Sequence, residues 1–531
     1  MAPHSEIAER RLYVDGQEFL LLGAETHNSS TSTLEGICSS FEAAAQAGAN
    51  TVLAAVAWNQ FEPVEGEFAF ELADHMLATA AGLGLRLVPL WFGSYKNGKS
   101  SYVPDWVKTD LVRFPRAEVE AHRRIEHLSP FSPESVRADS TAFAAFMERL
   151  AVSEHSDVVI LVQVENEPGL LGDSRDRSRL ASARHESLVP RDVIEVVAAN
   201  PQMPAHDEWT ARGSLAEGTW AEVFGKSDTV DELFMAVAYA EYVEQVAEQG
   251  RRRFDVPLVV NAWLDVAYGV GVPSTFSDVA GGKRPGVYPS GGPVARVAPI
   301  WRALAPSIDV IGPDIYFGDF RAICEQYRRA SDAFMIPEMR SDAGGIAQMF
   351  LAIGEYEAVG VSPFGVDSLA PGSLAHEQLQ DAYRLLRSAH EILRSKPDPF
   401  RRGFLLETKG DSAELRLDGC TLHVEPHAQW GSEPVLPAYG LAIQEAPNQI
   451  IVIGRGFSVR FHADDGQVGI LSARELVWTG ERLIDGRLLN GDETSTGTVG
   501  RFPGFELSQG ASPIPKLKDM PGIVRFRLYN Y

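Results

Sequence analysis

The alternation of short apolar segments with helix-like segments along the first three quarters of the chain limits its fold most strongly. Eight apolar runs recur, at residues 18–25, 50–58, 85–92, 157–167, 256–263, 308–316, 333–339 and 358–365. Segments with apolar residues at helical spacing lie between most of them, such as 34–49, 73–84 and 231–253. Continuous apolar strands that alternate with helices indicate a parallel sheet covered by helices on both faces.

Eight β/α units over about 390 residues predict an α/β fold, the (β/α)8 TIM barrel. The alternative, an open doubly wound sheet, favours a glycine-rich phosphate loop after the first strand, and the segment GAETHNSS is not such a loop. Two long insertions, 93–137 and 168–230, and a polar loop, 271–293, follow the third, fourth and fifth strands. Loops in these places lie on the catalytic face of a barrel, so we expect them to shape a substrate cleft.

The sequence changes character near residue 396, where SKPDPFRRG combines two prolines with a glycine. Beyond this point Val, Ile, Leu and Phe alternate with polar residues in short segments, with turn signals about every 8–12 residues. This pattern is typical of an antiparallel β-sandwich. We therefore predict a catalytic barrel over residues 1–395 and a β-sandwich accessory domain over residues 396–531.

The charge and the cysteines bear on partners and location. The chain has 48 Lys and Arg against 72 Asp and Glu, a formal charge of −24, which disfavours nucleic acid and membrane surfaces as partners. Three cysteines (Cys38, Cys324 and Cys420) lie far apart and form no disulfide or metal pattern. The apolar run near the start is too short for a signal or a membrane span, so we expect a cytoplasmic protein. Self-association into a homo-oligomer stays open.

The ends of the predicted strands indicate what the barrel binds, because functional side chains of a barrel cluster there. In this chain those ends carry mainly carboxylates, amides and aromatic rings. Such a mixture suits a sugar, whose hydroxyls need polar partners and whose C–H faces stack on rings. The 13 His residues are scattered and HExxH does not occur, so neither a metal nor another cofactor is expected.

Two glutamates at strand ends are candidates for catalysis. Glu167 ends the fourth strand and Glu338 ends the seventh, so the two lie across the barrel mouth from each other. Cleavage of a glycosidic bond needs two carboxyl groups, one to protonate the leaving oxygen and one to attack or stabilise the anomeric carbon. The pair therefore predicts a glycosidase, although each residue alone could belong to a structural ion pair.

Eight more residues near the strand ends are candidates for binding substrate: Asn166, Glu165, Tyr316, His27, Trp58, Trp91, Asn261 and Phe364. Glu165 precedes Glu167 by two positions and should face the same way, where it binds a sugar hydroxyl or holds the barrel rim. The phenol of Tyr316 either orients Glu338 or packs in the core. Each aromatic ring is a sugar platform or a core residue, and the histidine contacts substrate or has a structural role.

The segment LVQVENEPG (161–169) resembles the acid/base segment of glycoside hydrolase family 35 β-galactosidases. Other segments resemble a bacterial branch of that family, which is also similar to family 42 and carries a C-terminal domain of unknown function: GAETHNSSTST (23–33), NTVLAAVAWNQFEPVEGEFAF (50–70), YPSGGP (288–293), MIPEMRS (335–341) and IGEYEAVGVSPFGVDS (353–368). The resemblance covers nearly the whole chain. It implies that Glu167 is the general acid/base and Asn166 the sugar-binding amide. Pro168 and the run Met339-Arg340-Ser341 depart from the main family pattern near the sugar subsite.

These observations predict a retaining exo-β-glycosidase that acts on an oligosaccharide or glycoside by a two-glutamate double displacement, with β-galactosidase as the expected activity. The nearest alternative keeps the mechanism and changes the sugar to a glucoside or xyloside, or makes the chain a transglycosylase. A non-catalytic carbohydrate-binding protein is the alternative from another class. An aldolase- or isomerase-type barrel would need a Schiff-base lysine or a metal-ligand set at the strand ends, and neither is evident.

Overall fold

The computed structural model describes residues 4–265, 282–394, 400–428, 433–463, 466–480, 482–489, 491–495, 497–505 and 522–531, so residues 271–281 of the predicted polar loop lie outside it. The chain forms two compact units. The first comprises Met1–Ala45, Asn50–Met339 and Ser362–Ser368, and the second comprises Gln46–Ala49, Arg340–Val361 and Leu369–Tyr531. The boundary near residue 396 stays a prediction, because each of these units is made of several separate segments of the chain.

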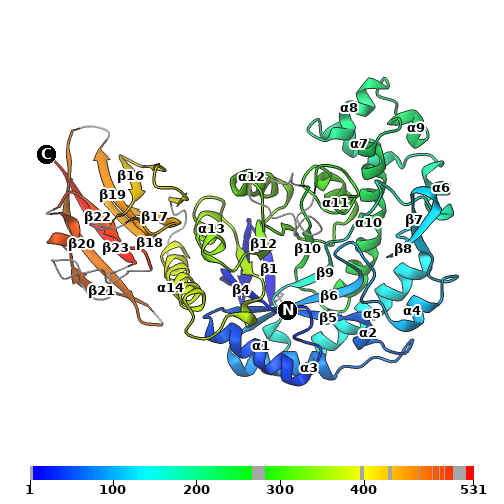
Figure 1. The fold of residues 1–531 in the computed structure, drawn as a ribbon, viewed down its shortest axis with the longest axis horizontal. Helices are drawn as coiled ribbons and strands as arrows, with labels where there is room; N and C mark the ends of the chain where they lie inside the picture. The colour runs from blue at the N-terminus through cyan, green and yellow to red at the C-terminus, as the bar shows by residue number, and fades with distance from the viewer. Residues whose placement is uncertain are drawn as a thin grey trace. The chain divides into compact units, whose positions relative to one another are not determined.

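Eight strands form a parallel barrel (Figure 1). They are β4 (Leu21–Glu25), β5 (Thr51–Ala57), β6 (Arg86–Lys96), β9 (Val162–Asn166), β10 (Leu258–Ala262), β11 (Val310–Pro313), β12 (Met335–Met339) and β13 (Gly360–Pro363). The neighbour order is β11-β10-β9-β6-β5-β4-β13-β12, and a parallel bridge between Ile315 and Met339 joins its two ends. The strands are almost wholly buried, which explains their continuous apolar runs. The predicted barrel is confirmed.

A helix follows each barrel strand in the chain, as a (β/α)8 fold requires. These helices are α1 (Leu34–Gln46), α3 (Glu71–Leu83), α5 (Pro133–Val152), α10 (Asp228–Arg251), α11 (Ala298–Leu304), α12 (Phe320–Ala330), α13 (Ala343–Gly354) and α14 (Leu374–Arg394). Local sequence explains where several begin. The Ser132 side chain caps α5, with Pro133 in the first turn, and the Ser227 side chain caps α10.

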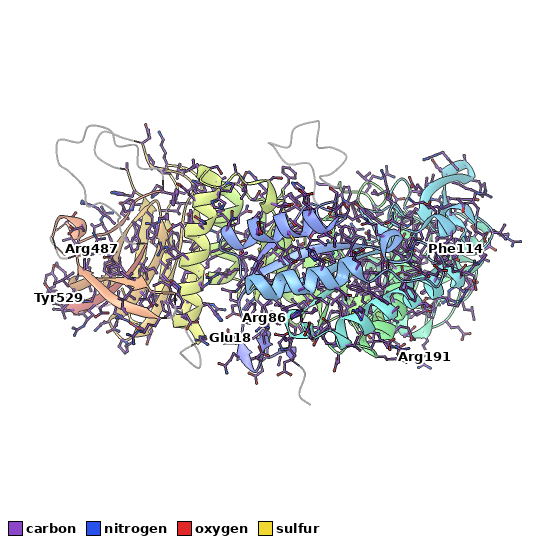
Figure 2. All side chains as sticks on the ribbon, turned by 90° about the horizontal axis from the view of Figure 1, so that it is seen from below. Glu18, Arg86, Phe114, Arg191, Arg487 and Tyr529 are labelled. Carbon is purple, nitrogen blue, oxygen red and sulfur yellow. The ribbon has the colours of Figure 1, made fainter. Side chains whose placement is uncertain are left out.

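The two insertions after the third and fourth barrel strands meet each other. The first contains α4 (Asp105–Thr109) and the hairpin of β7 (Arg116–Val119) and β8 (Arg123–Leu128). The second contains α6 (Arg179–His185), α7 (Arg191–Ala199), α8 (Pro204–Ala211) and α9 (Trp220–Val223). The backbone N–H of Arg177 donates to the Glu118 carbonyl at 2.7 Å. Figure 2 accordingly shows Phe114 of the first insertion and Arg191 of the second at the same end of the barrel unit.

Shorter elements complete the barrel unit. A three-stranded sheet of β1 (Ser5–Ala8), β2 (Arg11–Val14) and β3 (Gln17–Glu18) precedes the first barrel strand. The one-turn helix α2 (Trp58–Phe61) follows β5. None of the helices in the described part of the chain is both long and apolar enough to span a membrane.

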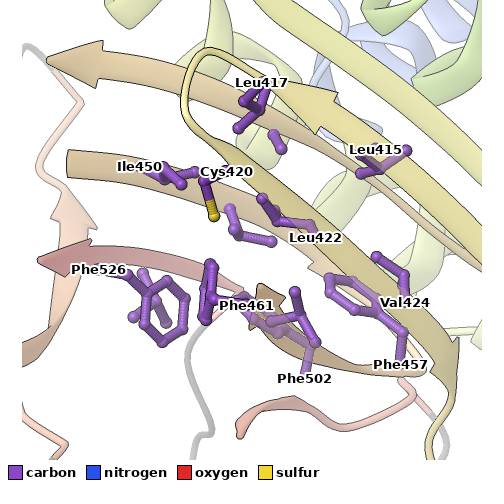
Figure 3. Close-up of a cluster of buried hydrophobic side chains, with 14 of the residues drawn as sticks. Leu415, Leu417, Cys420, Leu422, Val424, Ile450, Phe457, Phe461, Phe502 and Phe526 are labelled. Carbon is purple, nitrogen blue, oxygen red and sulfur yellow. The ribbon is translucent and has the colours of Figure 1, made fainter. Parts of the chain in front are cut away.

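The second unit contains two antiparallel sheets. The six-stranded sheet has the order β14-β17-β18-β23-β20-β21, and the four-stranded sheet has the order β15-β16-β19-β22. Their bounds are β14 (Arg401–Leu406), β15 (Ala413–Leu417), β16 (Cys420–Pro426), β17 (Ala438–Ala446), β18 (Gln449–Arg455), β19 (Phe457–Ala463), β20 (Val468–Trp478), β21 (Leu483–Leu488), β22 (Gly500–Phe502) and β23 (Ile523–Asn530). Both sheets contribute to one apolar core, in which Phe461 of β19 and Phe526 of β23 lie 4.9 Å apart (Figure 3). The predicted antiparallel sandwich is confirmed.

Candidate active site

Four neighbouring barrel strands bring polar side chains to one cluster at their carboxyl ends. Glu167 directly follows β9, Asn261 lies near the end of β10, Asp314 directly follows β11, and Glu338 lies near the end of β12. All four residues are buried, and Glu167 and Glu338 each keep 7% of their surface exposed. The order of the strands in the barrel therefore brings together carboxyl groups that are far apart in sequence.

Asn261 connects the two candidate catalytic glutamates. Its Oδ1 accepts the backbone N–H of Glu167 at 2.9 Å. Its Nδ2 donates to Asp314 Oδ2 at 2.8 Å and to Glu338 Oε1 at 3.4 Å. Because one amide contacts the backbone of one glutamate and the carboxylate of the other, Glu167 and Glu338 share one site.

Two further predicted residues contact the Glu338 carboxylate. The Tyr316 hydroxyl donates to Oε2 at 2.9 Å, which is the contact that the sequence suggested. The Asn166 amide donates to Oε1 at 3.3 Å, and its own oxygen accepts from Lys96 Nζ at 2.9 Å. Lys96 Nζ also lies 4.7 Å from the centre of the Phe92 ring, a cation–π contact that helps to hold the ammonium group beside the Asn166 amide.

The electrostatics of the cluster favour a protonated Glu167. Burial, followed by the nearby charge of Glu338, raises the pKa of Glu167 from 4.5 to about 8, although Lys96 and a hydrogen bond with Asp314 act to lower it. Burial, followed by the charges of Glu338 and Glu167, also raises the pKa of Asp314 well above its ordinary value. A carboxyl group that holds its proton at neutral pH can serve as a general acid.

Glu25 at the end of β4 is a further carboxyl group near this cluster. It is fully buried, and neither of its side-chain oxygens has a hydrogen-bond partner among the described residues. Burial and the charge of Glu338 raise its pKa well above the ordinary value, while Lys96 acts in the opposite direction. A buried carboxyl group with no partner is costly, and such groups concentrate at functional sites.

Glu165 points to a different place from Glu167. Its carboxylate accepts the backbone N–H groups of Ser94 at 3.2 Å and Tyr95 at 2.6 Å, on the neighbouring strand β6. The alternation that predicted a shared face fails because Glu165 and Glu167 both have a positive φ, of 61° and 47°. The geometry thus agrees with the second expectation for Glu165, that it holds the barrel rim.

Trp58 and Trp91 are fully buried, so neither presents a face to a sugar in this structure. The indole of Trp58 donates to Glu62 Oε2 at 2.7 Å, and that of Trp91 donates to Asp139 Oδ1 at 2.9 Å. Trp91 stacks on Phe146 at 5.6 Å between ring centres. Both rings therefore pack in the core, which was the alternative expectation for each aromatic residue.

His27 and Phe364 lie beside each other at the ends of adjacent strands. Their rings meet edge to face at 5.1 Å, and both side chains are partly exposed. His27 Nε2 lies 2.5 Å from the Ser368 hydroxyl, and the backbone N–H of His27 donates to Asp367 at 3.1 Å. Since the charge of Asp367 also reaches Glu25, this pair borders the carboxyl cluster.

The predicted set lacks two carboxyl groups that the structure places in the cluster, Asp314 and Glu25. The signal that selected Glu167 and Glu338, a carboxylate at the end of a buried strand, also applies to these two. Within the described ranges, no group of three or more His, Cys, Asp or Glu side chains is arranged to hold a metal ion.

Comparison with protein families identifies both parts of the chain. The model of glycosyl hydrolases family 35 matches residues 11–237, which include Glu167 and its neighbours. The chain carries a family 35 region. A domain of unknown function, DUF5597, matches residues 379–500. Both parts of the predicted resemblance, and the predicted enzyme class of glycoside hydrolases, are thereby confirmed. A comparison with curated proteins finds no match.

Solved structures with similarity to this chain include three enzymes. A β-galactosidase from the psychrophilic Marinomonas ef1 has 12% identity and a TM-score of 0.44 over 70% of this chain and 60% of its own. A β-galactosidase from the haloarchaeon Halorubrum lacusprofundi has 15% identity and a TM-score of 0.45, over 70% and 58%. The catalytic domain of a Paenibacillus polymyxa β-amylase has 11% identity and a TM-score of 0.47, over 68% of this chain and 97% of its own. The chain spans about 60% of the length of the Marinomonas enzyme.

Proposed function

We propose that this chain is a retaining exo-β-glycosidase that releases terminal, non-reducing β-D-galactosyl residues. One observation carries the proposal: the backbone N–H of Glu167 and the carboxylate of Glu338 both hydrogen-bond to Asn261, and the Tyr316 phenol donates to Glu338. Burial and the charge of Glu338 raise the pKa of Glu167 to about 8, which favours its acid form at neutral pH. A glycosidase needs one carboxylic acid and one carboxylate on either side of the scissile bond, and this cluster supplies both.

The proposed reaction has two displacements. Glu338 attacks the anomeric carbon while Glu167 protonates the departing oxygen, which leaves a glycosyl ester on Glu338. Glu167, now a carboxylate, then removes a proton from water, whose oxygen bonds to the anomeric carbon as the ester bond breaks. Tyr316 holds the carboxylate of Glu338 through its hydroxyl, 2.9 Å away. Asn166 lies where it can pass from Glu338 to a sugar hydroxyl next to the anomeric carbon.

Rescue by azide tests the roles of the two glutamates. Glu338→Ala should abolish turnover of an aryl β-galactoside, and added azide should restore it with the α-galactosyl azide as product. Glu167→Ala should instead give the β-galactosyl azide from an activated aryl galactoside, because azide then attacks the galactosyl ester. Normal turnover by Glu338→Ala would remove that residue from the mechanism.

Two measurements decide the stereochemistry and the sugar. Retention predicts that the β-anomer is released first, and it requires the carboxyl groups to lie about 5–5.5 Å apart rather than about 6.5–9.5 Å. A panel of nitrophenyl β-galactoside, β-glucoside and β-xyloside compares the sugars directly. Sugar binding without hydrolysis of any of them would reject the enzyme and favour a carbohydrate-binding protein.

Location and partners are also proposals. Cys38, Cys324 and Cys420 form no disulfide, which suits a reducing compartment such as the cytoplasm. The net charge of −24 favours a neutral glycoside over nucleic acid or a membrane surface as partner. Fractionation of the producing cells tests the first proposal, and recovery of the protein outside the cytoplasm would contradict it.

A further inference from the structure

Glu25 at the end of β4 has no role in the two displacements, although it is fully buried. Neither of its carboxyl oxygens has a hydrogen-bond partner among the described residues. In the same described part of the chain, two more buried polar atoms after barrel strands lack partners: Oδ1 of Asp314 after β11 and Nε1 of Trp263 after β10. Buried polar groups are costly unless they are paired, so these atoms indicate hydrogen bonds that a polar ligand completes.

The strand register places the Glu25 side chain on the inner face of the barrel. Paired residues of parallel strands, and residues two apart on one strand, face the same side of the sheet. Such steps lead from Glu25 to Asn261 by way of Leu53, Val88, Leu90, Gln163 and Val259. The Asn261 amide contacts Asp314 and Glu338, so the Glu25 side chain faces the side on which the carboxyl cluster lies.

The space beneath Glu25 is filled by other side chains. Gly23 lies two residues before Glu25 on the same face of β4. A Cβ atom on Gly23 would lie 2.7 Å from Ser362 Oγ and 2.8 Å from Leu53 Cδ1, so β13 and β5 close the barrel interior at this level. Phe364, which forms a parallel bridge with Glu25, is in contrast partly exposed. The Glu25 carboxyl group therefore lies between a closed floor and the mouth of the barrel.

Glu25 lies across the mouth from the gap between the two proposed catalytic glutamates. Glu167 follows β9 and Glu338 lies on β12, with β10 and β11 between these strands. On the other side of the barrel, β4 is separated from β12 by β13 and from β9 by β5 and β6. In the proposed reaction C1 of the sugar lies between Glu167 and Glu338, so the ring extends toward β4. C4 lies across the ring from C1, and C3 is next to it.

We propose that Glu25 is a substrate-binding residue whose two carboxyl oxygens hydrogen-bond to the O3 and O4 hydroxyls of the galactosyl residue. This inference rests on the proposed function and deepens it, because it names the side chain that recognises the sugar away from the scissile bond. A buried polar group that pairs only with a substrate hydroxyl discriminates strongly against an analogue without that hydroxyl, since the group is then left unpaired. Glu25 therefore sets part of the sugar specificity.

Aryl β-galactosides that lack one hydroxyl test this contact. Glu25→Met keeps the length of the side chain and removes both oxygens, so kcat/KM for the parent galactoside should fall about 100-fold or more. For the 3-deoxy and 4-deoxy galactosides the fall should be about tenfold or less, because the wild type has already lost a contact with them. For the 2-deoxy and 6-deoxy galactosides it should equal that of the parent. Glu25→Gln, which keeps an oxygen and N–H donors, should lose about tenfold on the parent.

The stability of the free protein separates substrate binding from a structural role. Glu25→Met breaks no hydrogen bond with a described residue and removes a buried carboxyl group, so its thermal transition should lie at or above that of the wild type. Glu62→Met is a matched control, because the buried Glu62 accepts from the Trp58 indole at 2.7 Å and from the Gly66 backbone N–H at 2.8 Å. That variant should unfold at a lower temperature and should change kcat/KM by one factor for every substrate.

The outcomes separate this inference from the proposed function. A fall by the same factor on all the galactosides would overturn the inference, and so would a smaller fall on the 2-deoxy or 6-deoxy galactoside alone. A loss of stability in Glu25→Met as large as that in Glu62→Met would assign Glu25 a structural role and overturn it too. Each of these results leaves the proposed function in place if the wild type hydrolyses the parent galactoside. A wild type that hydrolyses no β-glycoside would reject the function, and this inference with it.

Discussion

Removal of the proton-holding carboxyl group at Glu167 should stabilise the fold while it disables catalysis. The pKa of Glu167 is about 8 in the folded chain against an ordinary value of 4.5. The contribution of this group to stability is fully present below pH 4.5 and is lost as the pH rises toward 8, because the unfolded chain releases a proton that the fold retains. Glutamine has no such proton, so Glu167→Gln escapes this loss.

The size of the effect follows from the same shift. One pKa unit corresponds to about 1.4 kcal/mol, so the loss amounts to roughly 3 kcal/mol at pH 7 and approaches about 5 kcal/mol above pH 8. No reduction for solvent screening applies, since only 7% of the residue is exposed. Glu167→Gln should therefore gain stability over the wild type as the pH rises, in addition to any constant difference from changed contacts.

Thermal unfolding of the full chain at pH 5, 7 and 9 measures this gain. The difference in transition temperature between Glu167→Gln and the wild type should increase across this range. Two compact units need not unfold together, so the comparison uses the transition that the substitution moves. Glu42→Gln, an exposed position on α1, controls for the loss of one carboxylate. A difference that stays constant from pH 5 to pH 9 would refute the linkage argument.

Three further predictions concern single contacts. Tyr316→Phe removes the hydroxyl 2.9 Å from Glu338, and kcat/KM should fall about 10- to 100-fold in steady-state assays; an unchanged value would deny the contact any role. Arg455→Met removes the 2.8 Å partner of the partly buried Asp381 and leaves it the ion pair with Arg384, so denaturant unfolding should show a loss of about 1–3 kcal/mol in the second unit, unlike the same change at a surface arginine. Burial lowers the pKa of His127 to about 3, so the wild type should lose stability as the pH falls from 6.5 toward 3, and His127→Gln should lose less over that range in an acid titration followed by circular dichroism.

Most of the barrel could be predicted from hydrophobic patterning because buried parallel strands need apolar residues on both faces. The run NTVLAAVAW contains β5, and the run AFMIPEM contains β12, with ends that differ by one or two residues. The sandwich could be predicted in part for the same reason, because strands such as β16 bury every second residue and so show an alternating pattern.

Side-chain direction at the strand ends could not be predicted in the same way. Glu165 should have shared a face with Glu167, but two residues with positive φ turn the chain between strand and loop. Trp58 and Trp91 are of the residue type that stacks on sugars. Only their contacts in the fold, with Glu62 for Trp58 and with Phe146 and Asp139 for Trp91, show that they are core residues. Burial and rotamer depend on neighbours that are distant in sequence.

The sequence by itself determined which residues end the strands, and therefore which carboxyl groups, amides and rings stand at the catalytic face, because an apolar run marks a strand wherever it occurs. Only the tertiary structure decided that Glu167, Asn261, Asp314 and Glu338 come from four neighbouring strands and share hydrogen bonds. The physical reason is that the proton affinity of a carboxyl group depends on its burial and on charges a few ångströms away. Closure of the barrel creates this burial and these contacts by joining segments that are far apart in sequence, such as those of Asn166 and Glu338, which are separated by 172 positions.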